Sequence, residues 1–298
     1  MQKFLFSILV ASLVAPPAMA QIFDGLTNAK EIPKNITPWQ MGLTGAASQV
    51  AEQVQWFHNW VLMPLIIVIC VFVLLLLLVV IFRFSEKKNP VPSKVSHNTA
   101  LEIIWTAIPL LILGVMFIPS IKILYFMESS GPSDMTVKAV GHQWYWSYEY
   151  TDIKKFTIRD VDVDIDTTPK IVRYDSILVP KDDLPTNQQH LYRLKVDKPL
   201  YIPVNRRVKI ILTSQDVVHS FSVLPLGLKM DAIPGRNNET WVTATATGVY
   251  YGFCTELCGA GHSFMPIEVR VVSENEFQNW LNDGDPFATP NVGEQQSL

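Results

Sequence analysis

The 298-residue sequence contains only three cysteines and little net charge, and both shortages exclude classes of protein. Cys70 lies inside an apolar run, where a thiol serves as a small apolar side chain, so only Cys254 and Cys258 remain as a pair. A framework of several disulfides is therefore excluded. The formal net charge of -3 argues against a nucleic-acid-binding protein, which needs a strongly basic surface. The sequence also has no internal repeat and no glycine-rich loop of the phosphate-binding type.

Residues 1–20 have the pattern of a secretory signal peptide. Lys3 supplies the positive charge, residues 4–14 form the apolar core, and Ala18-Met19-Ala20 offers a small-residue cleavage site. An uncleaved anchor is disfavoured because this apolar run is too short to span the ~30 Å hydrocarbon core of a bilayer. We therefore expect an exported chain, beginning with an irregular segment over residues 21–55.

Apolar residues make up 49% of the sequence and are concentrated before residue 127. They predict a transmembrane hairpin over residues 56–127, with spans at about 61–82 and 101–126, because each run provides the ~20 residues that a spanning helix needs. Aromatic residues typical of a membrane interface precede the first span, at Trp56 and Trp60. The connection between the spans is basic, with Arg83, Lys87, Lys88 and Lys94. The positive-inside rule then predicts a multi-pass protein of the inner (plasma) membrane, with both termini and the following domain on the periplasmic side.

From Met135 onward the patterns indicate strands. Short β-branched and aromatic runs separated by turn signals occur at 137–150, 207–213, 220–224, 239–246, 249–253 and 266–272. Many short strands with this spacing predict a β-sandwich or barrel, here over residues 135–272. Ser273 and Glu276 form a capping box that predicts a short helix, followed by a flexible tail to residue 298.

One short loop concentrates soft metal ligands. Two thiols, an imidazole and a thioether occur together at Cys254, Cys258, His262 and Met265, and a second imidazole is available upstream at His219. Thiolate, thioether and imidazole ligands favour copper over magnesium or calcium. A mononuclear blue-copper site needs only one cysteine. The second thiol predicts a pair of copper ions bridged by two thiolates, each capped by one histidine, with the thioether and a backbone carbonyl as weak ligands.

Three other interpretations of this loop are open. In an oxidising compartment the two thiols could form a disulfide. A structural Cys2His2 zinc site would leave the thioether of Met265 without a role. The thiols could also be buried and bind nothing. The complete ligand set favours copper.

These residues resemble the binuclear copper A centre of cytochrome c oxidase subunit II. Two further runs resemble that family, from Gly141 to Tyr150 (GHQWYWSYEY) and from Lys229 to Arg236 (KMDAIPGR). The resemblance extends from about the first apolar span to the end of the copper domain. It implies a cupredoxin-like Greek-key barrel attached to a hairpin of two transmembrane helices. The copper A ligands that it implies are His219, Cys254, Glu256 through its backbone carbonyl, Cys258, His262 and Met265.

The resemblance also implies a function in the aerobic respiratory chain. Reduced cytochrome c would deliver electrons to two copper ions, and the electrons would pass to a haem in subunit I. Oxygen is reduced to water there, coupled to proton translocation. The partners implied are cytochrome c, subunit I, other oxidase subunits and membrane lipid, with no nucleic acid.

Several single residues acquire roles only through this resemblance. Trp144 would receive the electron from cytochrome c. The Glu256 carboxylate, a hard ligand, would bind a magnesium or manganese ion shared with subunit I. Cytochrome c is commonly basic around its haem edge, so acidic groups would steer its docking. The candidates by family position are Glu149, Asp152, Asp216 and Asp231. The stretch 153–204 resembles the family least.

Glu102 lies near the cytoplasmic start of the second span, and two roles are open for it. Taken alone, it is best interpreted as a first-turn carboxylate that the helix dipole stabilises. Ionisable residues at membrane depth can also be functional. The resemblance places a glutamate of the run 102–106 at the mouth of a proton path into subunit I, which favours the second role.

The aromatic run has the period of a strand. A period of two places Trp144, Trp146, Tyr148 and Tyr150 on one face and Tyr145 on the other. We expect Trp146 and Tyr148 in the core of the β domain. His142, in the same run, is expected to make a structural hydrogen bond.

Three other functions compete with electron transfer as interpretations of the same residues. A membrane-anchored copper delivery or storage protein would favour exposed, exchangeable Met or Cys clusters. A quinol oxidase subunit II shares the hairpin and barrel but lacks the copper ligands. An anchored thiol–disulfide oxidoreductase would need a reactive cysteine pair but neither His219 nor Met265.

Overall fold

The computed structural model describes residues 42–91, 93–129, 131–151, 157–158, 161–162 and 172–282. The expected signal peptide, most of the N-terminal segment that follows it, and the C-terminal tail after residue 282 lie outside the described residues.

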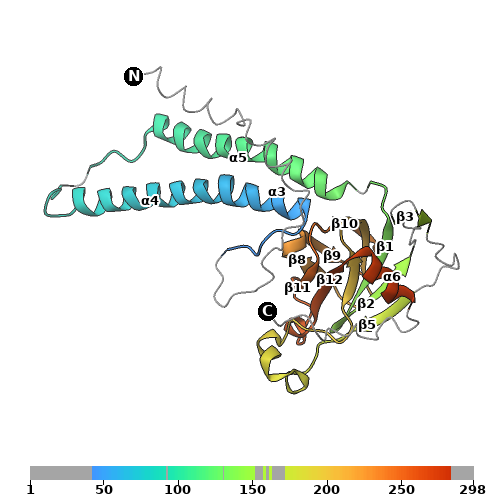
Figure 1. The fold of residues 1–298 in the computed structure, drawn as a ribbon. Helices are drawn as coiled ribbons and strands as arrows, with labels where there is room; N and C mark the ends of the chain where they lie inside the picture. Colours follow the sequence, from blue (N-terminus) through green and yellow to red (C-terminus); the bar gives the residue numbers. More distant parts are fainter. Residues whose placement is uncertain are drawn as a thin grey trace, which may run out of the picture.

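Two long helices lie beside each other and extend away from the β domain (Figure 1). The first comprises α3 (Gln49–Phe57), the π-helical turn η1 (His58–Leu62) and α4 (Met63–Arg83). The second is α5 (Thr99–Glu128). Both are long and apolar enough to cross a membrane, and their apolar side chains are exposed, as lipid-facing side chains would be. The two expected apolar helices are therefore present.

Local sequence explains how these helices begin. The side chains of Ser48 and Asn98 accept hydrogen bonds from backbone N–H groups of the first turns of α3 and α5. The π-helical turn ends two residues before Pro64, which has no N–H to donate to the carbonyl of Trp60. The backbone N–H of Met63 donates instead to the carbonyl of His58, one residue further back than in an α-helix.

The β domain is built from two five-stranded sheets. The first has the order β10-β7-β1-β2-β5, and the second has the order β6-β12-β11-β8-β9. Its strands are β1 (Met135–His142), β2 (Tyr145–Thr151), β5 (Val172–Ser176), β6 (Leu200–Pro203), β7 (Arg207–Ser214), β8 (His219–Val223), β9 (Leu228–Ala232), β10 (Asn238–Thr243), β11 (Gly248–Cys254) and β12 (Pro266–Val272). A small hairpin of β3 (Thr157–Ile158) and β4 (Val161–Asp162) is also described.

Most neighbouring strands pair antiparallel, whereas β1 pairs parallel with β7 and β6 pairs parallel with β12. Buried and partly exposed residues alternate along β7, as the two-residue period of a strand requires. Trp146, Tyr148, Leu212, Phe221 and Ile267 are fully buried in the core. The architecture expected from the sequence is confirmed: a membrane-type helical hairpin plus an all-β, cupredoxin-like domain.

Two strand predictions are wrong in detail. The run expected over 137–150 is two strands, β1 and β2, joined by a tight turn at Gln143 and Trp144. Trp144 therefore does not share the strand face of Trp146, Tyr148 and Tyr150, which are all buried. The alternation of aromatic residues continues through the turn, so the sequence pattern alone does not reveal where the chain reverses.

In the two five-stranded sheets, three strands were missed, namely β5, β6 and β9. Strand β6 is buried at all four residues and contains a proline, so it has no alternation to detect. Strand β9 presents Lys229 and Asp231 on its exposed side within only five residues. Strand β5 lies in the stretch where the family resemblance is weakest.

The C-terminal helix α6 (Glu274–Asn282) begins with the predicted capping box. The Ser273 N–H donates to the Glu276 carboxylate at 2.9 Å, and the Glu276 N–H donates to the Ser273 hydroxyl at 3.3 Å. The buried ring of Trp280 lies 4.9 Å from Tyr201 and 5.1 Å from Tyr150, between ring centroids. This helix therefore covers one end of the core.

Several contacts tie the helical hairpin to the β domain. The Ser48 hydroxyl donates to the carbonyl of Leu226 at 2.8 Å. At the end of α5, the rings of Phe126 and Trp241 meet edge to face, with centroids 5.3 Å apart. The Arg207 guanidinium lies 3.8 Å above the Trp241 ring and donates to the carbonyl of Ser129. The β domain is thus held directly against the membrane-type helices.

Candidate metal centre

The soft ligands come together at one end of the second sheet. His219 is the first residue of β8, and Cys254 is the last residue of β11. These strands are paired, with Cys254 opposite Phe221. Cys258 lies in the loop that follows, and the short helix η5 (His262–Phe264) leads to Met265 and then to β12. The ligands therefore lie where strands give way to loops.

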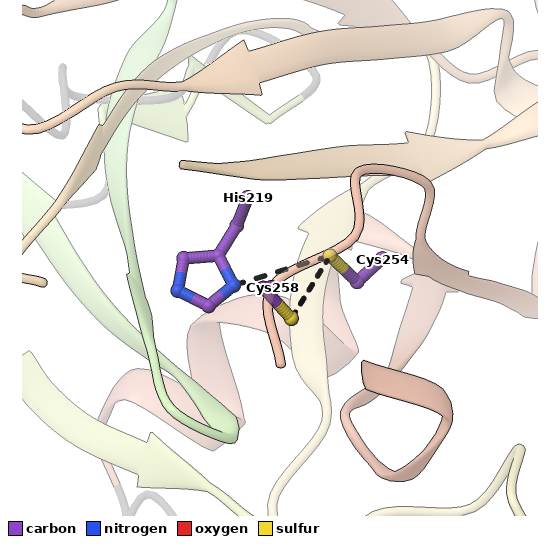
Figure 2. A group of neighbouring side chains, drawn as sticks. All are labelled: His219, Cys254 and Cys258. Atoms are coloured by element: carbon purple, nitrogen blue, oxygen red, sulfur yellow. Dashed lines mark hydrogen bonds between the residues drawn. The ribbon is translucent and has the colours of Figure 1, made fainter. Parts of the chain in front are cut away.

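The two sulfur atoms lie at the centre of the cluster (Figure 2). Cys254 Sγ lies 3.9 Å from Cys258 Sγ and 3.9 Å from His219 Nδ1. Cys258 Sγ lies 3.5 Å from both His262 Nδ1 and Met265 Sδ. The carbonyl oxygen of Glu256 lies 3.2 Å from Cys254 Sγ. A disulfide has a sulfur–sulfur distance of about 2.05 Å, so the two thiols are free.

These separations suit a metal centre. Ligands bound tetrahedrally to one metal at about 2.0–2.3 Å lie roughly 3.5 Å from one another, which is close to the distances here. The ligand atoms of His219, Cys254 and Cys258 all lie within 4.8 Å of one another, and all three residues are buried. Met265 is buried as well. The donor set of two thiols, two imidazoles, a thioether and a carbonyl fits soft, copper-type coordination.

The two thiols differ in acidity. Burial opposes ionisation of Cys254, but hydrogen bonds with His219 and with backbone groups outweigh it and lower the pKa of that thiol to about 7. Burial and the nearby charge of Cys254 raise the pKa of Cys258 to about 12. Without a cation between them, the two sulfurs therefore hold one negative charge more readily than two.

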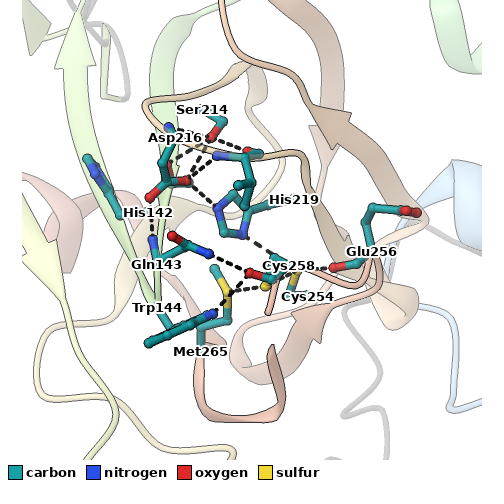
Figure 3. A network of polar contacts seen from close by, with 12 residues as sticks. His142, Gln143, Trp144, Ser214, Asp216, His219, Cys254, Glu256, Cys258 and Met265 are labelled. Carbon is teal, nitrogen blue, oxygen red and sulfur yellow. Dashed lines mark hydrogen bonds and ion pairs between the residues drawn. The ribbon is translucent and has the colours of Figure 1, made fainter. Parts of the chain in front are cut away.

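The orientation of His219 is set by Asp216 (Figure 3). Asp216 Oδ1 lies 2.8 Å from His219 Nε2, so the opposite ring nitrogen faces Cys254 Sγ. The same carboxylate accepts the backbone N–H of Val217 at 2.6 Å on Oδ1 and that of Gln143 at 2.6 Å on Oδ2. Burial raises the pKa of Asp216, but these hydrogen bonds outweigh it and lower it overall. A carboxylate bonded to the distal nitrogen of a ligating histidine fixes its tautomer and ring orientation.

This finding gives a further role to Asp216, which is one of the docking carboxylates that the family resemblance implies. Its side chain is 32% exposed, and both oxygens accept hydrogen bonds within the site. Nothing in the sequence pattern around His219 identifies this contact, because it depends on the loop geometry between β7 and β8.

The turn between β1 and β2 lies against the metal loop. Trp144 Nε1–H donates to the carbonyl of Cys258 at 3.2 Å, and the Gln143 side-chain amide donates to the same carbonyl at 2.8 Å. The peptide bond joining Gln143 and Trp144 is cis. Trp144 is 37% exposed, and its ring reaches from solvent to a ligand residue. Gln143 was not expected at the site, because its glutamine side chain carries no metal-binding signal.

Close approach of Trp144 explains a glycine in the loop. A Cβ atom added to Gly261 would lie 2.3 Å from Trp144 Cδ2, far inside van der Waals contact. The ring therefore stacks directly on the backbone between the second thiol and His262.

The remaining predicted residues lie elsewhere. The Glu256 side chain and Asp231 are exposed, and Asp231 lies on β9 beside β8. Glu149 stands between Lys138 and Arg173 in the sheet register, so cations flank it on both sides. Asp152 lies outside the described residues. Glu102 is exposed in the first turn of α5. His142 makes the predicted structural bond, with Nε2 2.8 Å from the Ser147 hydroxyl.

Together the fold and the cluster define a class: a membrane-anchored, cupredoxin-like protein with a thiol–imidazole–thioether metal centre. A family model described as the periplasmic domain of cytochrome c oxidase subunit II matches residues 135–272, and the model of its transmembrane domain matches residues 36–123. The chain belongs to the cytochrome c oxidase subunit II family. It is therefore a subunit of a haem–copper oxidase, whose other subunits are its partners.

Two named relatives agree with this assignment. The chain is 43% identical over 244 residues to the probable cytochrome c oxidase subunit 2 of Rickettsia bellii, covering 82% of this chain and 84% of that protein. It is 40% identical over 248 residues to cytochrome c oxidase subunit 2 of Oenothera berteroana, covering 83% and 90%. The solved periplasmic domain of cytochrome oxidase subunit II from Bradyrhizobium japonicum is 40% identical, with a TM-score of 0.42, covering 53% of this chain and 99% of that one.

Proposed function

We propose that this subunit accepts electrons from reduced cytochrome c at a binuclear copper A centre and passes them to a haem in subunit I. The ligands would be His219, Cys254, the carbonyl of Glu256, Cys258, His262 and Met265. Bound there, the two copper ions would supply a one-electron relay. The oxygen-reducing site and proton translocation would belong to subunit I.

The observation that carries this proposal is the pairing of sulfur and imidazole. Each thiol has its own histidine, at 3.9 Å for Cys254 with His219 and 3.5 Å for Cys258 with His262. One metal ion would not use two thiols, two imidazoles, a thioether and a carbonyl within a tetrahedral set. Two ions sharing both sulfurs would use all six donors.

Trp144 gives this centre a route to the surface. Its exposed ring is the natural contact for the haem edge of cytochrome c, and its Nε1–H donates to the carbonyl of Cys258. An electron arriving at the ring would therefore be one hydrogen bond from a ligand residue. Gln143 donates to the same carbonyl and holds the turn against the loop.

Other assignments extend the proposal. Asp231, Glu149 and Asp152 remain candidates for steering cytochrome c, with the cations beside Glu149 weakening its case. The exposed Glu256 carboxylate is free to reach a magnesium or manganese ion shared with subunit I. Glu102 would lie at the entrance of a proton path.

The placement in the cell follows the sequence. The chain would be exported by a signal peptide over residues 1–20 and lie in the inner (plasma) membrane. The segment 21–55 would precede the hairpin at 56–127. The copper domain at 135–272 and the tail at 273–298 would be periplasmic.

A copper delivery or storage function is the alternative. Delivery requires ligands that another protein can reach, whereas Cys254 and Cys258 are only 4% and 3% exposed. Burial of this kind favours a permanently bound relay.

Electron paramagnetic resonance of the full chain, solubilised in detergent and loaded with copper, tests the proposal. We expect one unpaired electron shared equally over two copper nuclei, in the parent and in the control variant Cys70→Ser. Cys254→Ser should abolish that signal. A parent spectrum of a single isolated copper, or a disulfide between Cys254 and Cys258 with no copper bound, would refute it.

A further inference from the structure

Residues 177–197, which we call the lobe, form a closed segment within the stretch that resembles the family least. Its ends are joined by two hydrogen bonds: Ile177 N–H donates to Asp197 Oδ1 at 2.7 Å, and Asp197 N–H donates to the carbonyl of Ile177 at 2.9 Å. A further β-bridge joins Leu178 and Val196. The lobe contains two short helices, η2 (Lys181–Asp183) and η3 (Thr186–Leu191), and follows β5 in yellow in Figure 1.

The base of the lobe is attached to the strand that leaves the metal loop. Val196 N–H donates to Glu268 Oε2 at 3.3 Å, and Glu268 is buried on β12. Its other oxygen accepts from Arg270 Nε at 3.0 Å, which compensates the buried charge. Because β12 begins directly after Met265, the lobe and the metal loop share one rigid support.

One lobe side chain reaches the metal loop. The guanidinium carbon of Arg193 lies 4.5 Å from the centroid of the Phe264 ring, within cation–π range. Phe264 stands between the ligands His262 and Met265, and its N–H donates to the carbonyl of Gly261 at 2.8 Å. Arg193 therefore covers the last turn of the loop.

The backbone of Arg193 adds a second, independent observation. Its φ is 70°, in the left-handed region that residues other than glycine, asparagine and aspartate rarely adopt. The described residues contain one other such position outside glycine, Asn205 at 58°, and asparagine tolerates this conformation. An arginine at a position where glycine would be less strained points to a role for its side chain.

We propose that Arg193 is a positioning residue that holds the Phe264 turn of the metal loop closed, so that His262 and Met265 are arranged before copper binds. This inference rests on the proposed copper site for its purpose, but the contact itself joins two side chains that are not metal ligands. An exposed cation–π contact shifts an equilibrium by about two- to fivefold. Opening of the loop should become more frequent by that factor when the guanidinium is removed.

Hydrogen exchange on the metal-free full chain in detergent measures this opening directly. In Arg193→Ala and Arg193→Gly, the amides of residues 261–265 should exchange about two- to fivefold faster than in the parent. Arg193→Lys keeps a cation above the ring and should restore most of the protection. Lys181→Ala, which removes an exposed cation elsewhere in the lobe, should leave exchange in the loop unchanged.

The glycine variant separates positioning from general instability. Because glycine relieves the positive φ, Arg193→Gly should melt at the same temperature as the parent or higher, while its loop opens more often. After loading with copper, Arg193→Gly and Arg193→Ala should release the metal to a chelator faster by a similar factor. The reduction potential of the copper centre should fall in both variants because a cation is removed, and Arg193→Lys should keep the potential of the parent.

Parent-like exchange of residues 261–265 in both Arg193→Gly and Arg193→Ala would overturn the inference. Equal acceleration in Lys181→Ala would overturn it too, because the effect would then belong to the lobe as a whole. If the parent chain binds no copper, the proposed function fails, while exchange in the metal-free chain still decides the role of Arg193.

Discussion

Replacing Asp216 with asparagine should weaken copper binding without removing any ligand. In the parent, Asp216 Oδ1 faces His219 Nε2 and the Val217 N–H, while Oδ2 faces the Gln143 N–H. Every neighbour of the two oxygens is a donor. Asparagine has one accepting oxygen and one donating nitrogen, so one side of the group must place donor against donor.

The size of the effect follows from these contacts. Loss of an outer-shell partner of a metal-bound histidine typically lowers metal affinity about 10- to 100-fold, or about 1.4–2.7 kcal/mol. Asp216 is partly exposed, and water can replace some of what is lost, so we expect the lower half of this range. The metal-free chain should also lose about 1–3 kcal/mol of folding stability, because a donor is left without its acceptor.

Competition with a copper chelator, using the full chain in detergent at neutral pH, measures the affinity of Asp216→Asn. Asp175→Asn, at an exposed position on β5, is the matched control and should bind copper like the parent. Replacing a docking carboxylate would have a different effect: it would raise the KM for cytochrome c and weaken the salt dependence of that KM, while copper binding stayed intact. If Asp216→Asn retained full copper affinity and changed only those kinetic quantities, the orienting role argued from its hydrogen bonds would be wrong.

Three further results are expected. Gly261→Ala should displace the Trp144 ring and lower folding stability by about 1–3 kcal/mol, although the φ of −90° at this position suits alanine. Stopped-flow kinetics should then show slower electron transfer from cytochrome c at unchanged copper content, and an unchanged rate would contradict the stacking argument. Copper affinity should rise with pH, and more steeply below pH 7 than above it. The reason is that the pKa of Cys254 is lowered to about 7, and a thiol that is already ionised releases no proton when copper binds. A pH-independent affinity, measured by chelator competition, would contradict thiolate ligation. Ser273→Ala should lower folding stability by about 1 kcal/mol through loss of the cap on Glu276 N–H, visible as a lower melting temperature with unchanged copper spectra.

Local patterns account for most of what could be predicted. A run of about 20 apolar residues is sufficient to identify a membrane-type helix, because hydrophobic length is a property of consecutive residues. The capping box at Ser273 and the soft ligands between Cys254 and Met265 are likewise contained in short segments. Strand β7, whose buried and partly exposed residues alternate, was predicted, whereas β6 is buried at every residue and has no alternation to detect.

The sequence by itself therefore determined the hairpin, the β class of the following domain, the family and the chemical kind of the metal centre. Only the tertiary structure decided which distant groups surround that centre. His219 meets Cys254 across 35 positions, and Trp144 meets the carbonyl of Cys258 across 114. Asp216 faces His219, and Arg193 covers Phe264, because of loop conformations and strand register. Periodicity reports which face of an element is apolar, whereas such contacts depend on how separate elements are brought together in space.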